Sequence, residues 1–192
     1  MTTWVVFYIL VAYFAGAISS AIPLCRILNK PDPRAEGSGN PGATNVLRVA
    51  GKVPALTVLL FDVLKGAIPT YLAYLHGLHD WTLGLVAISA CIGHMYPIYY
   101  RFEGGKAVAT ALGAMLPIGW PLAISLLATW LLVFRLSRYS SLAALTTLIF
   151  APFYTYLYKP EFTVAVSMLS VLIIVKHKSN IVRLLKGIEK PV

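Results

Sequence analysis

Three short polar segments interrupt an otherwise apolar chain, and each has residue types that bind phosphate. They are residues 36–45 followed by Arg48, residues 102–110, and residues 176–183. Glycines permit sharp turns, free N–H groups at a helix start attract anions, and Arg or Lys adds positive charge. If all three segments lie on one side of a membrane, they can form a site for anionic substrates at a bilayer surface.

The first segment has the composition of a turn that leads into a short helix. Thr44 or Asn45 can cap a helix that runs towards Arg48 and stops at Gly51. The neutral hydrogen-bond donors around this turn are Ser38, Asn40 and Asn45. A glycine-rich turn with ordinary helix capping is the competing interpretation.

In the second segment, Gly104 and Gly105 precede Lys106, and a helix is expected from Ala107. The backbone amides and the ammonium group can then cradle phosphate together. The pattern is not a Walker A loop, which needs Gly at position 100 and Ser or Thr at position 107, where this chain has Tyr100 and Ala107. The alternative for Lys106 is a charge that only sets membrane topology.

The third segment contains His177, the side chain that we expect to titrate near neutral pH. Ser179 or Asn180 can cap a short amphipathic helix that carries Arg183. Such a helix can contribute to a site, or it can simply lie on anionic lipid.

The composition indicates a membrane protein. Of the 192 residues, 58% are hydrophobic and only 12% are charged, whereas soluble domains carry about 25% charged residues. The uncharged stretches long enough to cross a hydrocarbon core of about 30 Å are residues 4–25, 81–100 and 139–158. Residues 53–75 form a further candidate, interrupted by Asp62 and Lys65, and residues 162–175 are shorter but uncharged.

The uncharged stretch 107–134 decides the topology. Pro117 and Pro121 flank a glycine near its middle, so we predict two short helices joined by a tight turn. With the resulting seven spans, fourteen of the sixteen Lys and Arg residues fall on one side, Lys159 falls alone on the other, and Lys65 lies within a span. With six spans, eight of these Lys and Arg residues would lie on one side of the membrane and seven on the other. The positive-inside rule therefore favours an all-α protein with seven transmembrane helices, the N-terminus outside and the C-terminus in the cytoplasm.

Residues 1–192 show no internal repeat or linker, so we expect a single membrane-embedded domain. The net charge of +9 follows from the topology, and nucleic-acid binding is not expected. Cys25 and Cys91 fall near or within spans, which argues against a disulfide or metal framework. The first apolar stretch is longer than the hydrophobic region of a typical signal sequence, lacks a basic N-terminal flank and is expected to be retained.

Ionisable side chains within the spans are expected to have structural roles. Asp62 and Lys65 are three residues apart, so they share a helix face and can pair. His94 lies one turn before Pro97, and we expect it to be packed and hydrogen-bonded.

Five blocks along nearly the whole chain match a known family in order and spacing. They are Gly37 to Asn45; Phe61-Asp62 with Lys65-Gly66; Gly93-His94 with Pro97; Phe102, Gly104-Gly105-Lys106 and Ala109-Thr110; and His177, Asn180-Ile181, Arg183-Leu184, Gly187 and Glu189. With these blocks the sequence resembles the bacterial acyl-phosphate:glycerol-3-phosphate acyltransferase family. One departure is mild: many members have Gly after the lysine of the second segment, where this chain has Ala107.

The resemblance implies a multi-pass enzyme of the bacterial cytoplasmic (inner) membrane, with its active site facing the cytoplasm. It would transfer a fatty acyl group from acyl phosphate to the sn-1 hydroxyl of glycerol 3-phosphate. The products would be 1-acylglycerol 3-phosphate (lysophosphatidic acid) and phosphate, in the first acylation step of phospholipid synthesis. It implies no cofactor, no metal, no acyl-CoA donor and no obligate protein partner.

Matching the family motifs residue by residue places Ser38, Arg48, Lys106, His177 and Asn180 at the catalytic centre. Residues assigned to substrate contact are Gly37, Gly39, Asn40, Gly42, Thr44, Asn45, Gly104, Gly105 and Thr110. Asp62, Lys65 and His94 are assigned to structural support of the site. Either His177 or a substrate phosphate oxygen can act as the general base, and a covalent acyl intermediate on Ser38 is not expected.

Two other classes of function compete with this interpretation. A transporter for an anionic metabolite would suit the buried Asp62 and Lys65 and the broken helices. However, the polar segments gather at one face, and no internal repeat is visible. A membrane scaffold without activity would leave the glycine loops unexplained.

Overall fold

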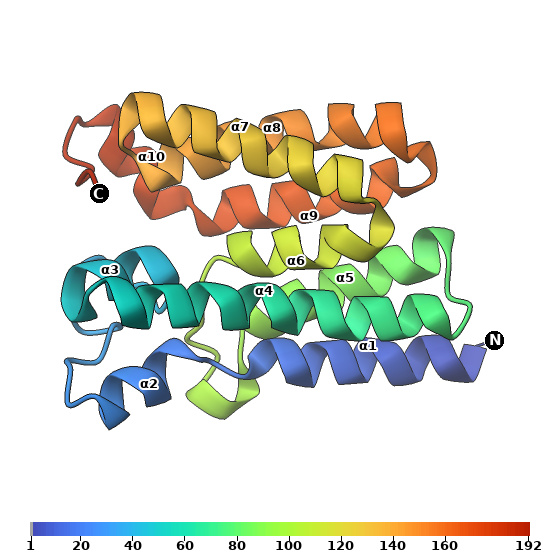
Figure 1. Ribbon diagram of the computed structural model, residues 1–192, viewed down its shortest axis with the longest axis horizontal. Coiled ribbons are helices and arrows are strands. Elements are labelled where there is room, and N and C mark those ends of the chain that lie inside the picture. Colours follow the sequence, from blue (N-terminus) through green and yellow to red (C-terminus); the bar gives the residue numbers. More distant parts are fainter. Residues whose placement is uncertain (1) are drawn as a thin grey trace.

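The computed structural model describes residues 2–192, and within that range it contains helices and no strands. Long helices run lengthwise and side by side (Figure 1), and the longest connection between α-helices is the loop of residues 28–42. The α-helices are α1 (Thr2–Ala17), α2 (Ala21–Ile27), α3 (Ala43–Ala50), α4 (Lys52–Leu75), α5 (Asp80–Met95), α6 (Val108–Ile118), α7 (Trp120–Ser137), α8 (Ser140–Tyr158), α9 (Thr163–Lys176) and α10 (Lys178–Leu185). Two 3-10 turns, η1 (Ile98–Tyr100) and η2 (Pro160–Phe162), complete the fold.

The expected all-helical membrane fold is confirmed, whereas the count of seven crossings stays a prediction. Among the described residues, five helices are long and apolar enough to cross a membrane, and six if the bent pair α9 and α10 is one span. The stretch 107–134 does form two helices, α6 and α7, separated at Gly119. With 11 residues, α6 is about 16 Å long, so the seventh crossing depends on this short helix.

The first apolar stretch forms one candidate span, Thr3–Ile27, as predicted, but its helix is not continuous. It breaks after Ala17 and resumes at Ala21. At the break, Lys65 of α4 donates a hydrogen bond from Nζ to the carbonyl oxygen of Ile18 at 2.9 Å. This contact satisfies a carbonyl group that the interrupted helix leaves free, and it depends on tertiary packing that the local sequence does not encode.

Helices α4 and α6 pack with their backbones in direct contact, which fixes the start of α6 beside α4. A Cβ atom added to Gly66 would lie 2.1 Å from the carbonyl oxygen of Thr110, and one added to Gly113 would lie 2.0 Å from that of Val63. Small residues allow such close approach where apolar helices associate in lipid. Because Lys106 lies two residues before α6, this packing also determines where its side chain begins.

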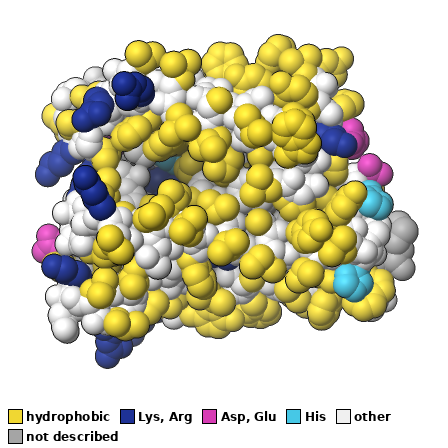
Figure 2. All heavy atoms as spheres, in the orientation of Figure 1, with side chains coloured by type: hydrophobic (Ala, Val, Ile, Leu, Met, Phe, Trp, Pro, Cys, Tyr) yellow, Lys and Arg dark blue, Asp and Glu magenta, His cyan; other side chains and the backbone are white. Residues whose placement is uncertain are grey.

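The two ends of the bundle differ in charge. Figure 2 shows Lys and Arg side chains gathered at the end that carries α2, α3 and α10 in Figure 1. The face between the two ends is covered by hydrophobic side chains, as expected for contact with lipid.

Candidate functional site

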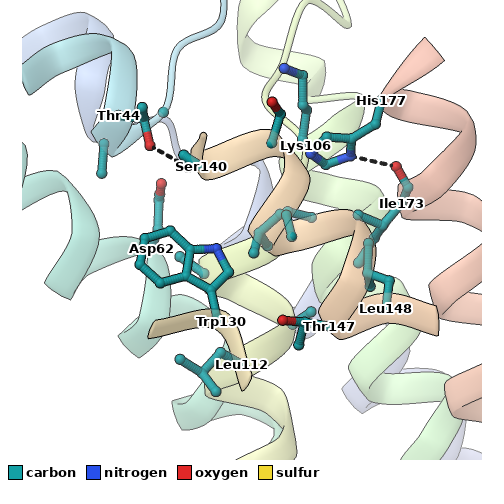
Figure 3. Close-up of a pocket in the computed structure, with 18 of the residues that line it drawn as sticks. Thr44, Asp62, Lys106, Leu112, Trp130, Ser140, Thr147, Leu148, Ile173 and His177 are labelled. Atoms are coloured by element: carbon teal, nitrogen blue, oxygen red, sulfur yellow. Dashed lines mark hydrogen bonds between the residues drawn. The ribbon is translucent and has the colours of Figure 1, made fainter. Parts of the chain in front are cut away.

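A cavity of about 450 Å³ opens among α3, α4 and α6 to α10. Its polar end receives side chains from all three polar segments, and its remainder is lined mostly by apolar side chains of α4 and α6 to α9 (Figure 3). The predicted residues that line it are Ser38, Asn40, Gly42, Thr44, Asn45, Arg48, Asp62, His94, Lys106, His177 and Asn180. The fold therefore brings together segments that are far apart in the sequence.

Asn45 organises the first segment. Its amide nitrogen donates to the carbonyl oxygens of Pro33 at 2.8 Å and Glu36 at 2.9 Å, and its Oδ1 accepts from the backbone N–H of Ser38 at 2.8 Å. The left-handed Gly37, with φ of 65°, passes so close that a Cβ there would lie 2.2 Å from this Oδ1. Asn45 thus holds the turn that presents Ser38 to the cavity.

The capping predicted for this segment is wrong. Gly42 is the N-cap of α3, and no side chain caps the helix. Asn45 is engaged with the loop, and the Thr44 hydroxyl lies 3.0 Å from that of Ser140 on α8 (Figure 3). The predicted stop at Gly51 is confirmed, because this residue has φ of 92° and ends α3.

Arg48 lies on the cavity wall and also holds the C-terminal tail. One of its nitrogens, Nη2, donates to the carbonyl oxygen of Lys190 at 2.8 Å. Four of the five guanidinium N–H donors are not needed for this bond. Arg48 can therefore bind an anion in the cavity while it holds the tail.

Lys106 is the cation at the centre of the polar end. Its Nζ donates to Oδ1 of Asn180, which joins the second and third segments. Burial lowers the pKa of Lys106 to about 8, with the positive charges of Arg183 and Arg48 acting in the same direction and Glu189 opposing them. A phosphate group placed here would favour the charged form of Lys106.

The two glycines before Lys106 pack against His94 of α5. The N–H of Gly105 donates to the carbonyl oxygen of His94 at 3.1 Å, and a Cβ on Gly105 would lie 2.1 Å from Nε2 of that histidine. Gly104 and Gly105 line a second cavity of about 10 Å³ behind the loop and not the large cavity itself. These glycines therefore place Lys106 by close packing.

His177 ends α9 and is buried beside the cavity. A backbone carbonyl only accepts hydrogen bonds, so the 2.8 Å contact with the Ile173 oxygen assigns the proton to Nδ1 and leaves Nε2 as an acceptor (Figure 3). Burial lowers the pKa of His177 to about 4, and Lys106 adds to this effect despite the opposing bond to Ile173. The expectation that His177 titrates near neutral pH is therefore wrong.

Asn180 binds across the site and does not cap α10 as predicted. Helix α10 begins at Lys178 with His177 as its N-cap, and Ser179 makes no capping bond there. The amide nitrogen of Asn180 donates to Glu189 at 2.6 Å while its oxygen accepts from Lys106.

Glu189 and Ser141 are site residues that the motif analysis did not assign. The Glu189 carboxylate accepts from Ser141 at 2.7 Å, from Asn180, and from Nε of Arg183 at 2.6 Å. Burial alone would raise the pKa of Glu189, but these hydrogen bonds outweigh it and lower the pKa. Glu189 stood in the last matched block and could have been found there, whereas no sequence signal marks Ser141.

Asp62 and Lys65 pair as predicted, with Nζ and Oδ1 2.8 Å apart and both side chains buried. His94 does not make the hydrogen bond that we expected. Its Nδ1 lies 3.7 Å from Asp62, too far for a hydrogen bond, and has no other partner among the described residues.

Besides Gly104 and Gly105, three more predicted contact residues lie away from the cavity wall. Gly37 and Gly39 shape the first turn with positive φ angles, and Thr110 is fully buried where α6 meets α4. None of the three lines the cavity.

The sequence matches known proteins along nearly its whole length. A family model described as glycerol-3-phosphate acyltransferase matches residues 6–187. A glycerol-3-phosphate acyltransferase of Idiomarina loihiensis is 58% identical over 190 residues, which cover 99% of this chain and 97% of that protein.

Solved structures show the same fold. The glycerol 3-phosphate form of PlsY (YgiH), an integral membrane glycerol 3-phosphate acyltransferase, superposes with a TM-score of 0.93 at 36% identity, over 98% of this chain and 95% of that one. The lysophosphatidic acid form of PlsY gives a TM-score of 0.90 at 35% identity, over 97% and 94% of the two chains.

Proposed function

Since this chain belongs to the glycerol-3-phosphate acyltransferase family, we propose that it transfers a fatty acyl group from acyl phosphate to the sn-1 hydroxyl of glycerol 3-phosphate. The observation that carries the proposal is the single cavity in which Arg48 and Lys106 share a wall with a long apolar lining. Both substrates carry phosphate, and the donor also carries an acyl tail. The polar and apolar parts of the cavity suit these two chemistries.

The reaction needs positioning more than activation, because acyl phosphate is already a reactive mixed anhydride. The sn-1 oxygen attacks the carbonyl carbon and forms the ester bond. The bond from that carbon to the phosphate oxygen breaks, and phosphate leaves with the electron pair. Arg48 and Lys106 bind the phosphate groups, while Ser38 and Asn180 orient substrate oxygens. Fixed donors of this kind stabilise charge that develops in the transition state.

The proton of the attacking hydroxyl has two possible acceptors. Nε2 of His177 is free to accept it, but the pKa of about 4 makes this nitrogen a weak base. A phosphate monoester has a second pKa near 6, so its oxygen is the stronger base of the two. We therefore assign proton acceptance to a substrate phosphate and a hydrogen-bond acceptor role to His177.

The proposed setting is the bacterial cytoplasmic membrane, crossed seven times by the single domain 1–192, with the N-terminus outside. The basic end of the bundle then faces the cytoplasm, where the polar end of the cavity meets a water-soluble substrate. The proposed reaction uses no cofactor, no metal ion and no partner protein.

The test is phosphate release by the purified protein in detergent, with acyl phosphate, glycerol 3-phosphate and EDTA present. We expect turnover that depends on both substrates, and none when acyl-CoA replaces acyl phosphate. Lys106→Ala should abolish turnover, while Lys186→Ala, a change at an exposed lysine outside the cavity, should not. Turnover with acyl-CoA, or a requirement for added metal, would contradict the proposal.

A further inference from the structure

The large cavity continues far below its polar end along α8. The lining residues of this helix are Ser140, Ser141, Ala144, Thr147, Leu148 and Ala151. They recur every three or four residues and so form one face of the helix. Eleven residues separate the first from the last, so the cavity follows α8 for about 16 Å.

Each of four helices contributes one lining residue that lies farthest along that helix from the polar end. These residues are Met115 of α6, Leu126 of α7, Ala151 of α8 and Val166 of α9. All four are buried, with 3 to 7% of their surface exposed. All four belong to one hydrophobic core, and we call them the cavity floor.

The next turn of each helix closes the space beyond the floor. The residues there are Ile118, Leu122, Thr155 and Phe162, of which Phe162 lies in η2 just before α9; all are buried and none lines the cavity. The three apolar ones belong to the same hydrophobic core as the floor residues. The cavity is therefore blind at this end.

Another side of the cavity is open between α4 and α7. Leu59 and Leu60 of α4 and Leu127 and Leu131 of α7 line it and are 40 to 54% exposed, and Figure 2 shows a hollow in this face. A hydrocarbon tail on this side would exchange contact with lipid for contact with leucine, which gives little discrimination by length. We call the part of the cavity among α6 to α9 that ends at the floor the blind arm. Only in this arm can a tail reach an end of the cavity.

We propose that the acyl tail of the donor enters this blind arm and that the cavity floor sets the longest tail that fits. The inference rests on the proposed function and specifies its substrate. Ala151 has the smallest side chain of the floor, so it determines how far a terminal methyl group can advance. A longer tail must displace closely packed neighbours, which a core resists.

The experiment measures kcat/KM for a series of saturated acyl phosphates of increasing length. Ala151→Leu should shorten the preferred tail and lower the ratio of long-chain to short-chain kcat/KM about tenfold or more, the scale on which pockets discriminate one methylene group. Met115→Ala should deepen the arm and raise the same ratio. Ala128→Leu is the matched control, because Ala128 is exposed on α7 and lies outside the cavity.

The two variants predict opposite shifts, so a folding defect in one leaves the other decisive. The inference is overturned if the wild-type protein turns over acyl phosphate but the length ratio of Met115→Ala equals that of Ala128→Leu. A wild-type protein that releases no phosphate with any chain length would instead overturn the proposed function.

Discussion

At the scale of single residues, Lys106 links charge to activity most directly. Its ammonium group is removed from water, surrounded by other cations and held by Asn180. In the empty site the charged form is therefore less favoured than in a lysine exposed to solvent. A dianionic substrate reverses this balance, so substrate binding and protonation of Lys106 are coupled.

This coupling predicts that the KM for glycerol 3-phosphate rises as pH increases through about 8. Below this pH Lys106 is protonated, and above it binding must take up a proton, which costs affinity. The substrate phosphate, with a second pKa near 6, stays fully ionised over this range and cannot produce the effect. Steady-state kinetics from pH 7 to 10 measure it.

Lys106→Arg is the matched variant, because guanidinium stays charged throughout this pH range. The KM of Lys106→Arg should be higher than that of the wild type at pH 7, because a guanidinium group does not fit the position from which the Lys106 ammonium group bonds to Asn180. This KM should not rise further with pH. A wild-type KM that is flat to pH 10 would contradict the prediction.

Ser38 provides a second prediction at this scale. The turn held by Asn45 presents Ser38 to the cavity, and His177 lines the same cavity but is a weak base. We therefore expect no acyl-enzyme: protein incubated with labelled acyl phosphate alone should carry no stable label, and kinetics should be sequential. Mass spectrometry detects the adduct, and an acyl ester on Ser38 would refute the assignment.

Residue types were easier to predict from sequence than residue contacts. Lys106 and Asn180 were expected at one site, but nothing in their segments indicated that they bind each other or share Glu189. His177 was expected to titrate near neutrality because the sequence reveals the imidazole and not its burial. Contacts and pKa values depend on neighbours that arrive from distant segments.

At the scale of elements, the loop before α6 depends on a tight fit against α5. We predict that Gly105→Ala destabilises the fold by about 1 to 3 kcal/mol, a typical cost of overpacking, and lowers activity by displacing Lys106. The added methyl group would lie 2.1 Å from His94 Nε2, so either the loop or the imidazole must move. Thermal unfolding in detergent and phosphate release measure the two effects.

Ala107→Gly is the control in the same loop. Ala107 has φ of 62°, a conformation that glycine adopts without penalty, so this variant should raise the melting temperature. If Gly105→Ala were as stable and active as the wild type, close packing against His94 would not be what positions Lys106.

The positions of the helices follow from the apolar pattern, whereas their breaks follow from tertiary contacts. The predicted stretch 139–158 and the observed α8 differ by one residue, because both ends are marked by polar residues. The break between α1 and α2 was missed, because the partner of the Ile18 carbonyl, Lys65, comes from another helix. The N-cap of α3 was misassigned because Asn45 is used by the loop.

At the scale of the whole molecule, charge and helix length favour different topologies. The basic end of the bundle favours seven crossings, but α6 is only about half as long as a hydrocarbon core of about 30 Å is thick. The loop before α6 resolves the conflict. It is bonded to His94 within α5, and we propose that α6 therefore starts below the membrane surface, where irregular backbone is tolerated because it lines cavities.

The α6–α7 turn should therefore reach the outer face. Figure 1 places it towards the end of the bundle that carries the α4–α5 turn and the N-terminus. We predict that Trp120→Cys, at a side chain that is 69% exposed, reacts with a membrane-impermeant maleimide in cells whose cytoplasmic membrane is intact. Cys25 and Cys91 are buried and would be replaced first to remove any background.

Lys186→Cys, near the C-terminus, calibrates the assay, since it should react only after the membrane is opened. In the alternative arrangement α6 dips into the membrane and returns, so Trp120→Cys would need permeabilisation whereas Lys186→Cys would react in intact cells. That result would place α7 in the opposite orientation and spread the basic residues over both faces. Segment 102–110 and His177 would then emerge on opposite sides of the membrane. This arrangement is inconsistent with the cavity that residues of both segments line. The contact between Lys106 and Asn180 thus predicts an even number of crossings from α6 to α9, which is met when α6 crosses together with α7, α8 and α9.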